Sequence, residues 1–182
     1  MKRTLTILTL ALAALAASAE RFAPATGSLI RVEGTSTLHE WTMEGADIKG
    51  QIDSTAPNAT VTIPVASIRS SHAKMDKLMS EALKAKQFPE IRYELIEATQ
   101  IPDGAASFTT KTKGRLTIAG VTREIAIDVQ GSRGSDGRYV LTGTAPVKMT
   151  SFGIKPPVAM MGTIKTGDDV KVTFRWIVVK AN

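Results

Sequence analysis

The strongest constraint on the fold is a regular alternation of apolar and polar residues over residues 114–129, GRLTIAGVTREIAIDV. Alternation with a period of two is typical of a β-strand that buries one face. Ala119 and Gly120 divide the segment and suit a two-residue turn, so it predicts an antiparallel hairpin. In that register Arg115 lies opposite Glu124 on the polar face, as a cross-strand pair of opposite charge. The other face is almost wholly apolar, and the fold must bury it.

The same alternation recurs along most of the chain and predicts about eight strands. The alternating segments are residues 28–35, 37–43, 46–52, 60–65, 91–95, 108–118, 121–129, 139–149 and 170–178. In the segment 139–149, Gly143 and Pro146 suggest a bend or bulge. Turn-rich pieces at 102–104, 134–137 and 166–169 separate strands. Strands with one apolar and one polar face favour an antiparallel sheet, which either packs as a sandwich or closes into a barrel.

One segment breaks this period and predicts a helix over residues 73–86. Its apolar residues fall at i, i+3, i+4, i+7 and i+8, and they are Met75, Leu78, Met79, Ala82 and Leu83. Ser70 or Ser71 can cap its start, and Phe88-Pro89 ends it. Two interpretations stay open: the helix plugs the barrel or packs on its wall, or it is a methionine-bearing lid that admits an apolar ligand.

Residues 1–19 have the pattern of a cleaved secretory signal peptide. They begin with Lys2 and Arg3, continue as an apolar run and end with small residues up to Ala19. An uncleaved membrane anchor is the alternative, but the run is shorter than the roughly 20 apolar residues of a spanning helix. We therefore expect an exported protein whose residues 20–182 form one domain.

The composition argues against several classes of function. The chain has no cysteine, which excludes disulfides, thiolate zinc sites and thiol nucleophiles. Its formal net charge of +6 comes from scattered residues, so the charge does not indicate a nucleic-acid surface. It is compatible with a weak attraction to anionic lipid surfaces. The two histidines, His39 and His72, lack a carboxylate partner for a metal site, and His39 and Glu40 point to opposite strand faces. We expect no enzyme activity, no metal and no cofactor.

Four segments carry a resemblance to a known family. They are GTSTLHEW (34–41), MDKLMSEALKAKQFPEIRYEL (75–95), KGRLTIAGVTREIAIDV (113–129) and SFGIKPPVAMMGTIKTGDDVKVTFRW (151–176). Together they resemble the YceI-like family of exported bacterial proteins. The resemblance implies an eight-stranded antiparallel, lipocalin-like β-barrel with one inserted helix and an elongated apolar lumen. It also implies a periplasmic location and a ligand with a long polyisoprenoid or isoprenoid quinone-like chain, and it brings no catalytic motif.

The candidate lipid-binding residues are mainly apolar side chains on the inward face. They are Trp41, Met43, Ile91, Tyr93, Leu95, Phe108, Leu116, Arg123, Ile125, Ile127, Leu141, Phe152, Met160, Phe174 and Trp176. Arg123 is the charged exception, and we expect it at the rim, where it either meets a ligand head group or caps loop carbonyls. An apolar, proline-stiffened segment, 154–162, either folds over a barrel opening, with Phe152, Met160 and Met161 as flexible contacts to a lipid tail, or packs against the barrel exterior.

Two hypotheses of function follow. In the first, the protein is a carrier or scavenger that holds one apolar chain in its lumen, and an aromatic content of only 5% favours an incompletely filled interior. In the second, the core is filled and the barrel binds an envelope protein or a second copy through exposed apolar residues such as Ile177 and Val179. A transient contact with a membrane surface is compatible with either.

Overall fold

The computed structural model describes residues 20–53, 58–101 and 105–181. The expected signal peptide, residues 1–19, and the expected turn at 102–104 lie outside these residues. The strands are β1 (Arg21–Pro24), β2 (Leu29–Ser36), β3 (Glu40–Gly45), β4 (Lys49–Asp53), β5 (Asn58–Pro64), β6 (Glu90–Ala98), β7 (Ser107–Ile118), β8 (Val121–Arg133), β9 (Tyr139–Lys148), β10 (Val158–Ala159) and β11 (Ile164–Lys180). The helices are α1 (Ala73–Ala82) and three short 3₁₀ helices, η1 (Val65–Ser67), η2 (Met149–Phe152) and η3 (Met160–Gly162).

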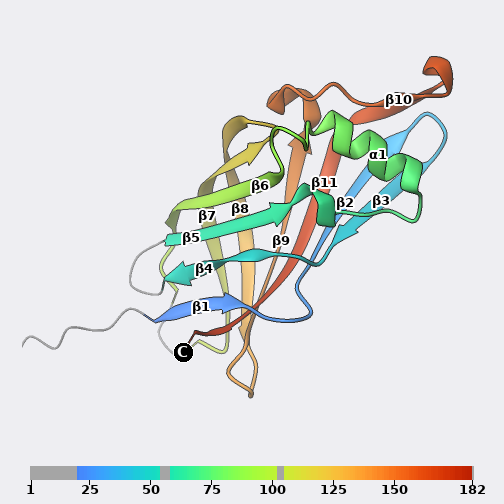
Figure 1. The fold of residues 1–182 in the computed structure, drawn as a ribbon. Helices are drawn as coiled ribbons and strands as arrows, with labels where there is room; N and C mark the ends of the chain where they lie inside the picture. Colours follow the sequence, from blue (N-terminus) through green and yellow to red (C-terminus); the bar gives the residue numbers. More distant parts are fainter. Residues whose placement is uncertain (1–19, 54–57, 102–104, 182) are drawn as a thin grey trace, which may run out of the picture.

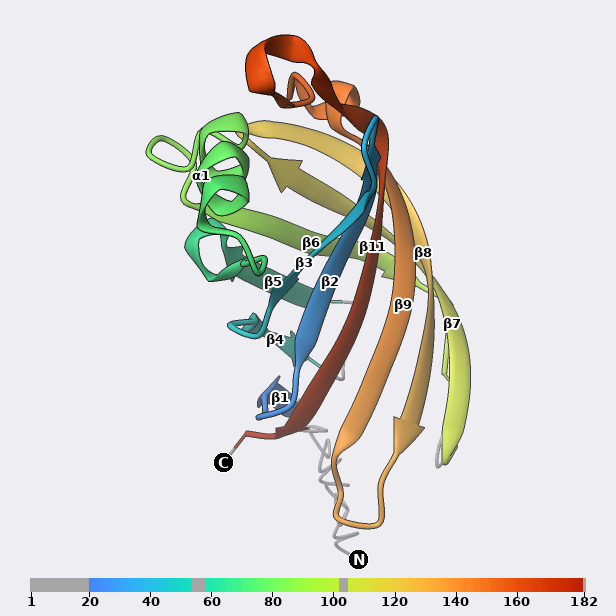
Figure 2. The same ribbon diagram turned by 90° about the vertical axis from the view of Figure 1, so that its right-hand side faces the viewer.

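The strands form a closed eight-stranded antiparallel β-barrel, as predicted (Figures 1 and 2). β1 and β2 lie along the same edge of β11, where Pro24 faces Val178 and Leu29 faces Arg175, so together they act as one interrupted strand. β3 pairs with β2 and β4 pairs with β1, which makes a second interrupted strand. The remaining strands follow in the order β5, β6, β7, β8, β9 and β11.

Helix α1 covers the part of the wall that the strands leave open. β4 pairs with β5, but β3 is joined to the segment before α1 by an isolated bridge between Glu44 and Arg69. Each of these two residues donates its backbone N–H to the other's carbonyl at 2.7 Å. After β5 the chain leaves the wall through η1, and α1 then lies across the space beside β3, β5 and β6 (Figure 2).

The hairpin at 114–129 has the predicted register. β7 and β8 pair with Arg115 opposite Glu124, and Ala119 (φ 49°) and Gly120 (φ 80°) form the turn in the left-handed region. The predicted ion pair is made differently, because the Glu124 carboxylate lies 2.8 Å from the Nζ of Lys113. Lys113 sits diagonally across from Glu124, and long side chains reach diagonal neighbours in a sheet.

Three local predictions were wrong. Gly143 and Pro146 mark no bulge, since β9 pairs with β11 in continuous register. On its other side β9 pairs with β8 only as far as Gly143, so no residue of β8 requires a backbone N–H from Pro146. The turn expected at 166–169 is a register shift inside the long strand β11. Neither Ser70 nor Ser71 caps α1, which ends at residue 82 rather than 86.

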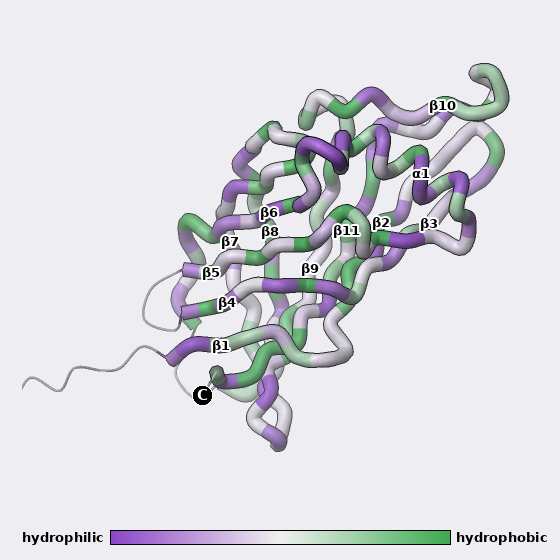
Figure 3. Tube along the Cα trace, viewed as in Figure 1, coloured by the Kyte–Doolittle hydropathy of each residue, from purple (hydrophilic) through white to green (hydrophobic). Residues whose placement is uncertain are grey.

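Apolar residues line the inside of the barrel in two continuous clusters. Green and purple segments alternate along the strands, as the period of two requires (Figure 3). One cluster is centred on Met43, Trp176 and Val178, and the other on Leu83 and Phe152 at the end covered by α1. The fold thus buries the apolar face that the alternation singled out.

The apolar outer patch expected on the last strand is absent. Ile177 is buried because the turn between β1 and β2 folds over it: Ala25 donates its N–H to the Ile177 carbonyl at 2.8 Å. The Ile177 N–H is in turn donated to the Ser28 hydroxyl at 3.0 Å. Val179 is half-buried opposite Ala23. The prediction of exposed apolar residues at these two positions was therefore wrong.

Candidate functional site

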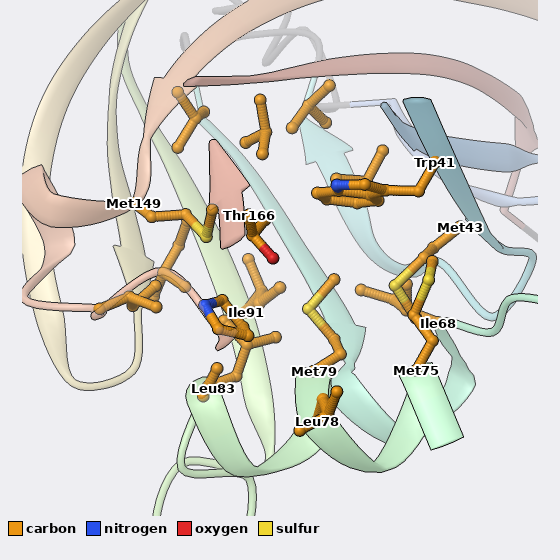
Figure 4. A pocket seen from close by; sticks show the side chains of 18 residues that line it. Trp41, Met43, Ile68, Met75, Leu78, Met79, Leu83, Ile91, Met149 and Thr166 are labelled. Atoms are coloured by element: carbon orange, nitrogen blue, oxygen red, sulfur yellow. The ribbon is translucent and has the colours of Figure 1, made fainter. Parts of the chain in front are cut away.

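An apolar cavity lies at the end of the barrel that α1 covers, and it is partly open to solvent (Figure 4). Its volume is about 140 Å³. The lining residues come from α1, from six strands and from the segments around η1 and η2, and they are Val32, Trp41, Met43, Ile68, Met75, Leu78, Met79, Ala82, Leu83, Ile91, Ile118, Val147, Met149, Ile154, Pro157, Thr166, Val170 and Val172. A cavity of ~150 Å³ lined by aliphatic and aromatic side chains stays dry and takes up a molecule of the size of benzene.

The lining carries no charge. The polar side-chain atoms of the lining residues are the Thr166 hydroxyl and the Trp41 indole N–H, which donates to the Thr35 carbonyl at 3.0 Å, so nothing in the wall compensates a buried charge. An apolar guest gains by leaving water, at ~25 cal/mol per Å² of apolar surface removed. The cavity is therefore suited to hydrocarbon and unsuited to an ion or a sugar.

Helix α1 forms one wall of the cavity with adaptable side chains. Met79 points from the helix towards Trp41 of β3, and Met75 lies near Met43 and Ile68 (Figure 4). None of the residues of α1 itself is fully buried. Methionine is flexible and fills irregular spaces, so this wall can be reshaped by rotamer changes at little cost.

Glycines on neighbouring strands hold the inward aromatic rings flat against the wall. A Cβ built on Gly34 would lie 2.2 Å from the Trp41 ring, and one on Gly131 would lie 2.1 Å from the Phe108 ring. The same holds for Gly114 with Tyr93, and for Gly143 with Phe174. Because each ring lies over a residue without a side chain, it covers the wall instead of crossing the lumen.

Two aromatic residues bring polar atoms into the interior. The Tyr93 hydroxyl donates to Thr112 Oγ1 at 3.4 Å, and burial raises the pKa of Tyr93 above its ordinary value, while this hydrogen bond acts in the lowering direction. Trp176 is buried, and its Nε1–H has no hydrogen-bond partner among the residues the structure describes. A buried N–H without a hydrogen-bond partner costs free energy, so the Trp176 indole N–H lowers the stability of the fold as it stands.

The structure brings together only part of the predicted lipid-binding set at the cavity. Trp41, Met43 and Ile91 line it. Three more of the set pack against the two apolar clusters, namely Leu116, Leu141 and Phe174, while Trp176 is a member of the first cluster and Phe152 of the second. Tyr93, Leu95, Phe108 and Ile125 are half-buried along β6, β7 and β8, and Ile127 is buried.

Two of the predicted contacts lie elsewhere. Arg123 is exposed, and its guanidinium donates to the carbonyls of Ser151 at 3.0 Å and Thr122 at 3.3 Å, which is the loop-capping alternative. Met160 is exposed near the end of the segment 154–162 and does not line the cavity, whereas Phe152, just before that segment, is buried. Ile154 and Pro157 of the segment line the cavity, while Met160 and Met161 project into solvent instead of packing against the barrel exterior.

The cavity residues that the sequence did not single out come mainly from outside the marked strands. Leu78 lies on α1, and Ile68, Ile154 and Pro157 lie in irregular segments. Only the helical spacing of the α1 residues signalled an apolar face, and it did not say what that face covers. The strand period also marked several lining residues that were not chosen as contacts, namely Val32, Val147, Met149, Val170 and Val172.

The two histidines lie on the surface and contact their sequence neighbours. His39 and His72 are both exposed; His39 Nδ1 lies 2.6 Å from the Glu40 carbonyl and His72 Nδ1 lies 2.8 Å from Ser71 Oγ. Within the described chain, no three histidine, aspartate or glutamate side chains cluster as a metal site would require.

Neither α1 nor any other helix in the described part of the chain has the length and apolar character needed to cross a membrane.

Solved structures with this fold come from several bacteria. A polyisoprenoid-binding domain from Saccharophagus degradans, implicated in plant cell wall breakdown, superimposes with a TM-score of 0.74 at 16% identity, over 90% of this chain and 100% of that chain. BcnA of Burkholderia cenocepacia gives a TM-score of 0.66 at 17% identity, over 82% and 95% of the two chains. The YceI protein of Campylobacter jejuni gives 0.56 at 20% identity, over 75% and 81%. No curated protein sequence matches the chain.

The match to a family is direct. The YceI-like domain fits residues 16–177, which is nearly the whole chain and includes every strand of the barrel from β1 to most of β11. The four segments that carried the resemblance in the sequence all lie inside this range. The chain therefore belongs to the YceI-like domain family.

Proposed function

We propose that this protein binds a long apolar lipid chain, of the polyisoprenoid or isoprenoid quinone type, inside the barrel and acts as its carrier or scavenger. The observation that carries the proposal is the cavity beneath α1, whose lining is apolar except for the Thr166 hydroxyl and the Trp41 indole N–H. The similarity to a polyisoprenoid-binding domain supports the same class of ligand. The signal-peptide pattern of residues 1–19 supports action outside the cytoplasm, in the periplasm.

Burial of methylene groups alone supplies enough affinity for such a ligand. Each buried CH₂ contributes about 0.8 kcal/mol, so roughly ten of them give about 8 kcal/mol. A free energy of that size corresponds to a dissociation constant near 1 μM. A carrier needs no reactive group and no charged anchor, which agrees with the uncharged lining.

The cavity accepts a long chain only if the α1 wall yields. At about 140 Å³ it holds a segment of roughly benzene size, which is much less than ten methylenes. On the α1 wall, Met79 points towards Trp41 and Met75 lies near Met43, and none of the residues of α1 is fully buried. We infer that the ligand displaces these methionines and shifts α1 outward, so that the helix is the lid through which the chain enters.

The test is the mass of what accompanies the protein. Native mass spectrometry of the protein purified from its own cells should show one bound lipid, which organic extraction releases as a compound with a long hydrocarbon chain. The substitution Val172→Trp places a large ring in the cavity lining and should abolish the extra mass. Thr144→Trp, on the exposed outer face of the adjacent strand β9, is the matched control and should leave the lipid bound.

Two results would decide against the proposal. One is a protein that carries no lipid from its own cells and takes up none when it is incubated with isoprenoid quinones. The other is a lipid that is retained equally by Val172→Trp and by Thr144→Trp, since this would place it outside the barrel. In either case the apolar interior of the barrel would serve stability and would not hold the lipid.

A further inference from the structure

The four most exposed large apolar side chains of the described residues lie at one end of the barrel. Met161 is 102% exposed, Leu38 66%, Met160 63% and Val158 51%. Val158, Met160 and Met161 belong to the hairpin of β10, η3 and β11, and Leu38 lies in the turn between β2 and β3. We call these four side chains the apolar tip.

Hydrogen bonds hold the two parts of the apolar tip together. Thr37 donates its N–H to the Lys165 carbonyl at 3.0 Å and its hydroxyl to the Thr163 carbonyl at 3.1 Å. Lys165 donates its N–H back to the Thr37 hydroxyl at 3.2 Å. Val158 faces Lys165 in the β10–β11 ladder. Leu38 therefore stands beside the hairpin in a fixed arrangement, and the apolar tip projects as one body (Figures 1 and 2).

The backbone of the hairpin is strained in a way that turns methionine outward. Met160 (φ 49°) and Met161 (φ 53°) both occupy the left-handed region, followed by Gly162 (φ 93°). That region is unfavourable for residues with a side chain. Met161 makes no compensating burial, because its side chain is fully exposed. Backbone strain that is not offset by burial of the side chain is common in functional segments.

Two lysines lie in the same segment of chain as the apolar tip and form no ion pair with the residues described. Lys155 lies three residues before Val158, and Lys165 faces Val158 in the β10–β11 ladder. Of the carboxylates on β11 beyond this ladder, Asp169 pairs with Lys148, while Asp168 accepts hydrogen bonds from Thr150 and keeps its charge. Glu40, two residues after Leu38, is exposed and forms no ion pair within the described chain.

The apolar tip lies at the end of the barrel that holds the cavity. Pro157, directly before β10, and Thr166, directly after the β10–β11 pairing, both line the cavity. α1, which forms one wall of the cavity, lies at the same end of the barrel as β10 in both views (Figures 1 and 2). A surface that meets the apolar tip therefore meets the end of the barrel where the cavity lies.

We propose that the apolar tip docks the protein on an anionic lipid bilayer, with its methionines inserted among the lipid chains and Lys155 and Lys165 on the headgroups. Four side chains on a convex end are far fewer than the roughly 20–30 residues that a stable protein interface takes from each partner. A bilayer accepts a convex apolar projection and attracts lysine through its surface potential. This docking does not depend on what the lumen binds.

The test uses sedimentation of purified protein with vesicles. Binding is measured for phosphatidylcholine vesicles with and without roughly 30% phosphatidylglycerol, at about 0.05 M and about 0.5 M salt. We expect binding to the anionic vesicles that weakens at high salt. Replacing both methionines, Met160→Asn and Met161→Asn, should lower the partition coefficient by about tenfold or more, because asparagine keeps the left-handed backbone but removes the apolar groups.

Charge-matched variants separate specific docking from general attraction. Lys155→Gln with Lys165→Gln should reduce binding to anionic vesicles several-fold, whereas Lys111→Gln with Lys113→Gln, which removes the same charge from the wall strand β7, should change it little. Equal losses from the two pairs would overturn the proposal. So would vesicle binding that survives the methionine replacement, or a wild-type protein that binds no vesicle and instead forms dimers that this replacement dissociates.

Discussion

The substitution Gly114→Ala tests whether the inward glycines shape the interior. An added Cβ would lie 2.3 Å from Cζ and 2.4 Å from the hydroxyl of Tyr93. Ordinary contacts between carbon atoms are about 3.5–4.0 Å, so the ring must move by roughly an ångström or more, towards the lumen. Overpacking of this kind costs ~1–3 kcal/mol, while alanine in place of glycine regains ~0.5–1 kcal/mol in a strand.

The net expectation is a loss of about 0.5–2 kcal/mol in the free energy of unfolding, with a melting temperature lower by roughly 1–8 °C. Urea and thermal unfolding followed by circular dichroism measure both quantities. In a Tyr93→Ala background, the same Gly114→Ala change should be neutral or stabilising, because no ring has to move. Gly134→Ala is the control, since its Cβ would meet the Asp136 carboxylate and the Arg138 carbonyl but no aromatic ring. If Gly114→Ala stabilises the wild-type protein, the reasoning that the ring rests on the glycine is refuted.

Three further predictions concern stability. The hydrogen bonds from Ser70 to the Asp76 carboxylate hold the pKa of Asp76 below its ordinary value. Their stabilisation is therefore present at neutral pH and is lost as the pH falls through that lowered pKa. Asp76→Asn should cost at most about 1 kcal/mol in urea unfolding at pH 7, and the difference from wild type should be smaller at about pH 2. Met43→Ala should cost about 2–5 kcal/mol in urea unfolding, since Met43 is buried in the core, whereas Leu38→Ala on the surface should change stability by less than about 0.5 kcal/mol. Trp176→Phe should cost less than about 1 kcal/mol because it also removes a buried N–H without a partner, and a loss of 3 kcal/mol or more would show that this N–H is satisfied in solution.

The strand pattern predicted the wall of the barrel well and its end poorly. The 114–129 hairpin was predicted to the residue pair because a period of two and a two-residue turn leave one register that buries the apolar face. The ion pair of Glu124 was missed because it depends on the reach of Lys113 across the sheet, which a pattern does not contain. The residues 166–169 have turn composition, yet Asp168 accepts hydrogen bonds from Thr150, which keeps this stretch inside β11 as a bulge.

The candidate site was predictable in kind but not in its outline. Apolar residues at inward positions predict an apolar interior, and Trp41, Met43 and Ile91 were chosen for that reason. Which of the other inward residues border empty space depends on where α1 and the segment 154–162 settle, and irregular segments have no period to read. Met160 shows the limit of composition: it is apolar, yet a left-handed backbone turns it to solvent.

The two interrupted strands divide the barrel into two halves. In the tied half the backbone hydrogen bonds between strands run without a break, whereas the other half has a seam between β3 and the chain before α1. In the tied half, β1 and β4 complete a continuous ladder with β11 and β5. Along the seam, the backbone hydrogen bonds described between β3 and the chain before α1 are the pair between Glu44 and Arg69. Parting this seam breaks two such bonds and leaves the ladders intact, so it is a local opening and not an unfolding event. The amide protons of these two residues should accordingly exchange with solvent faster than those of the β4–β5 ladder, and a long tail threaded into the barrel should slow them.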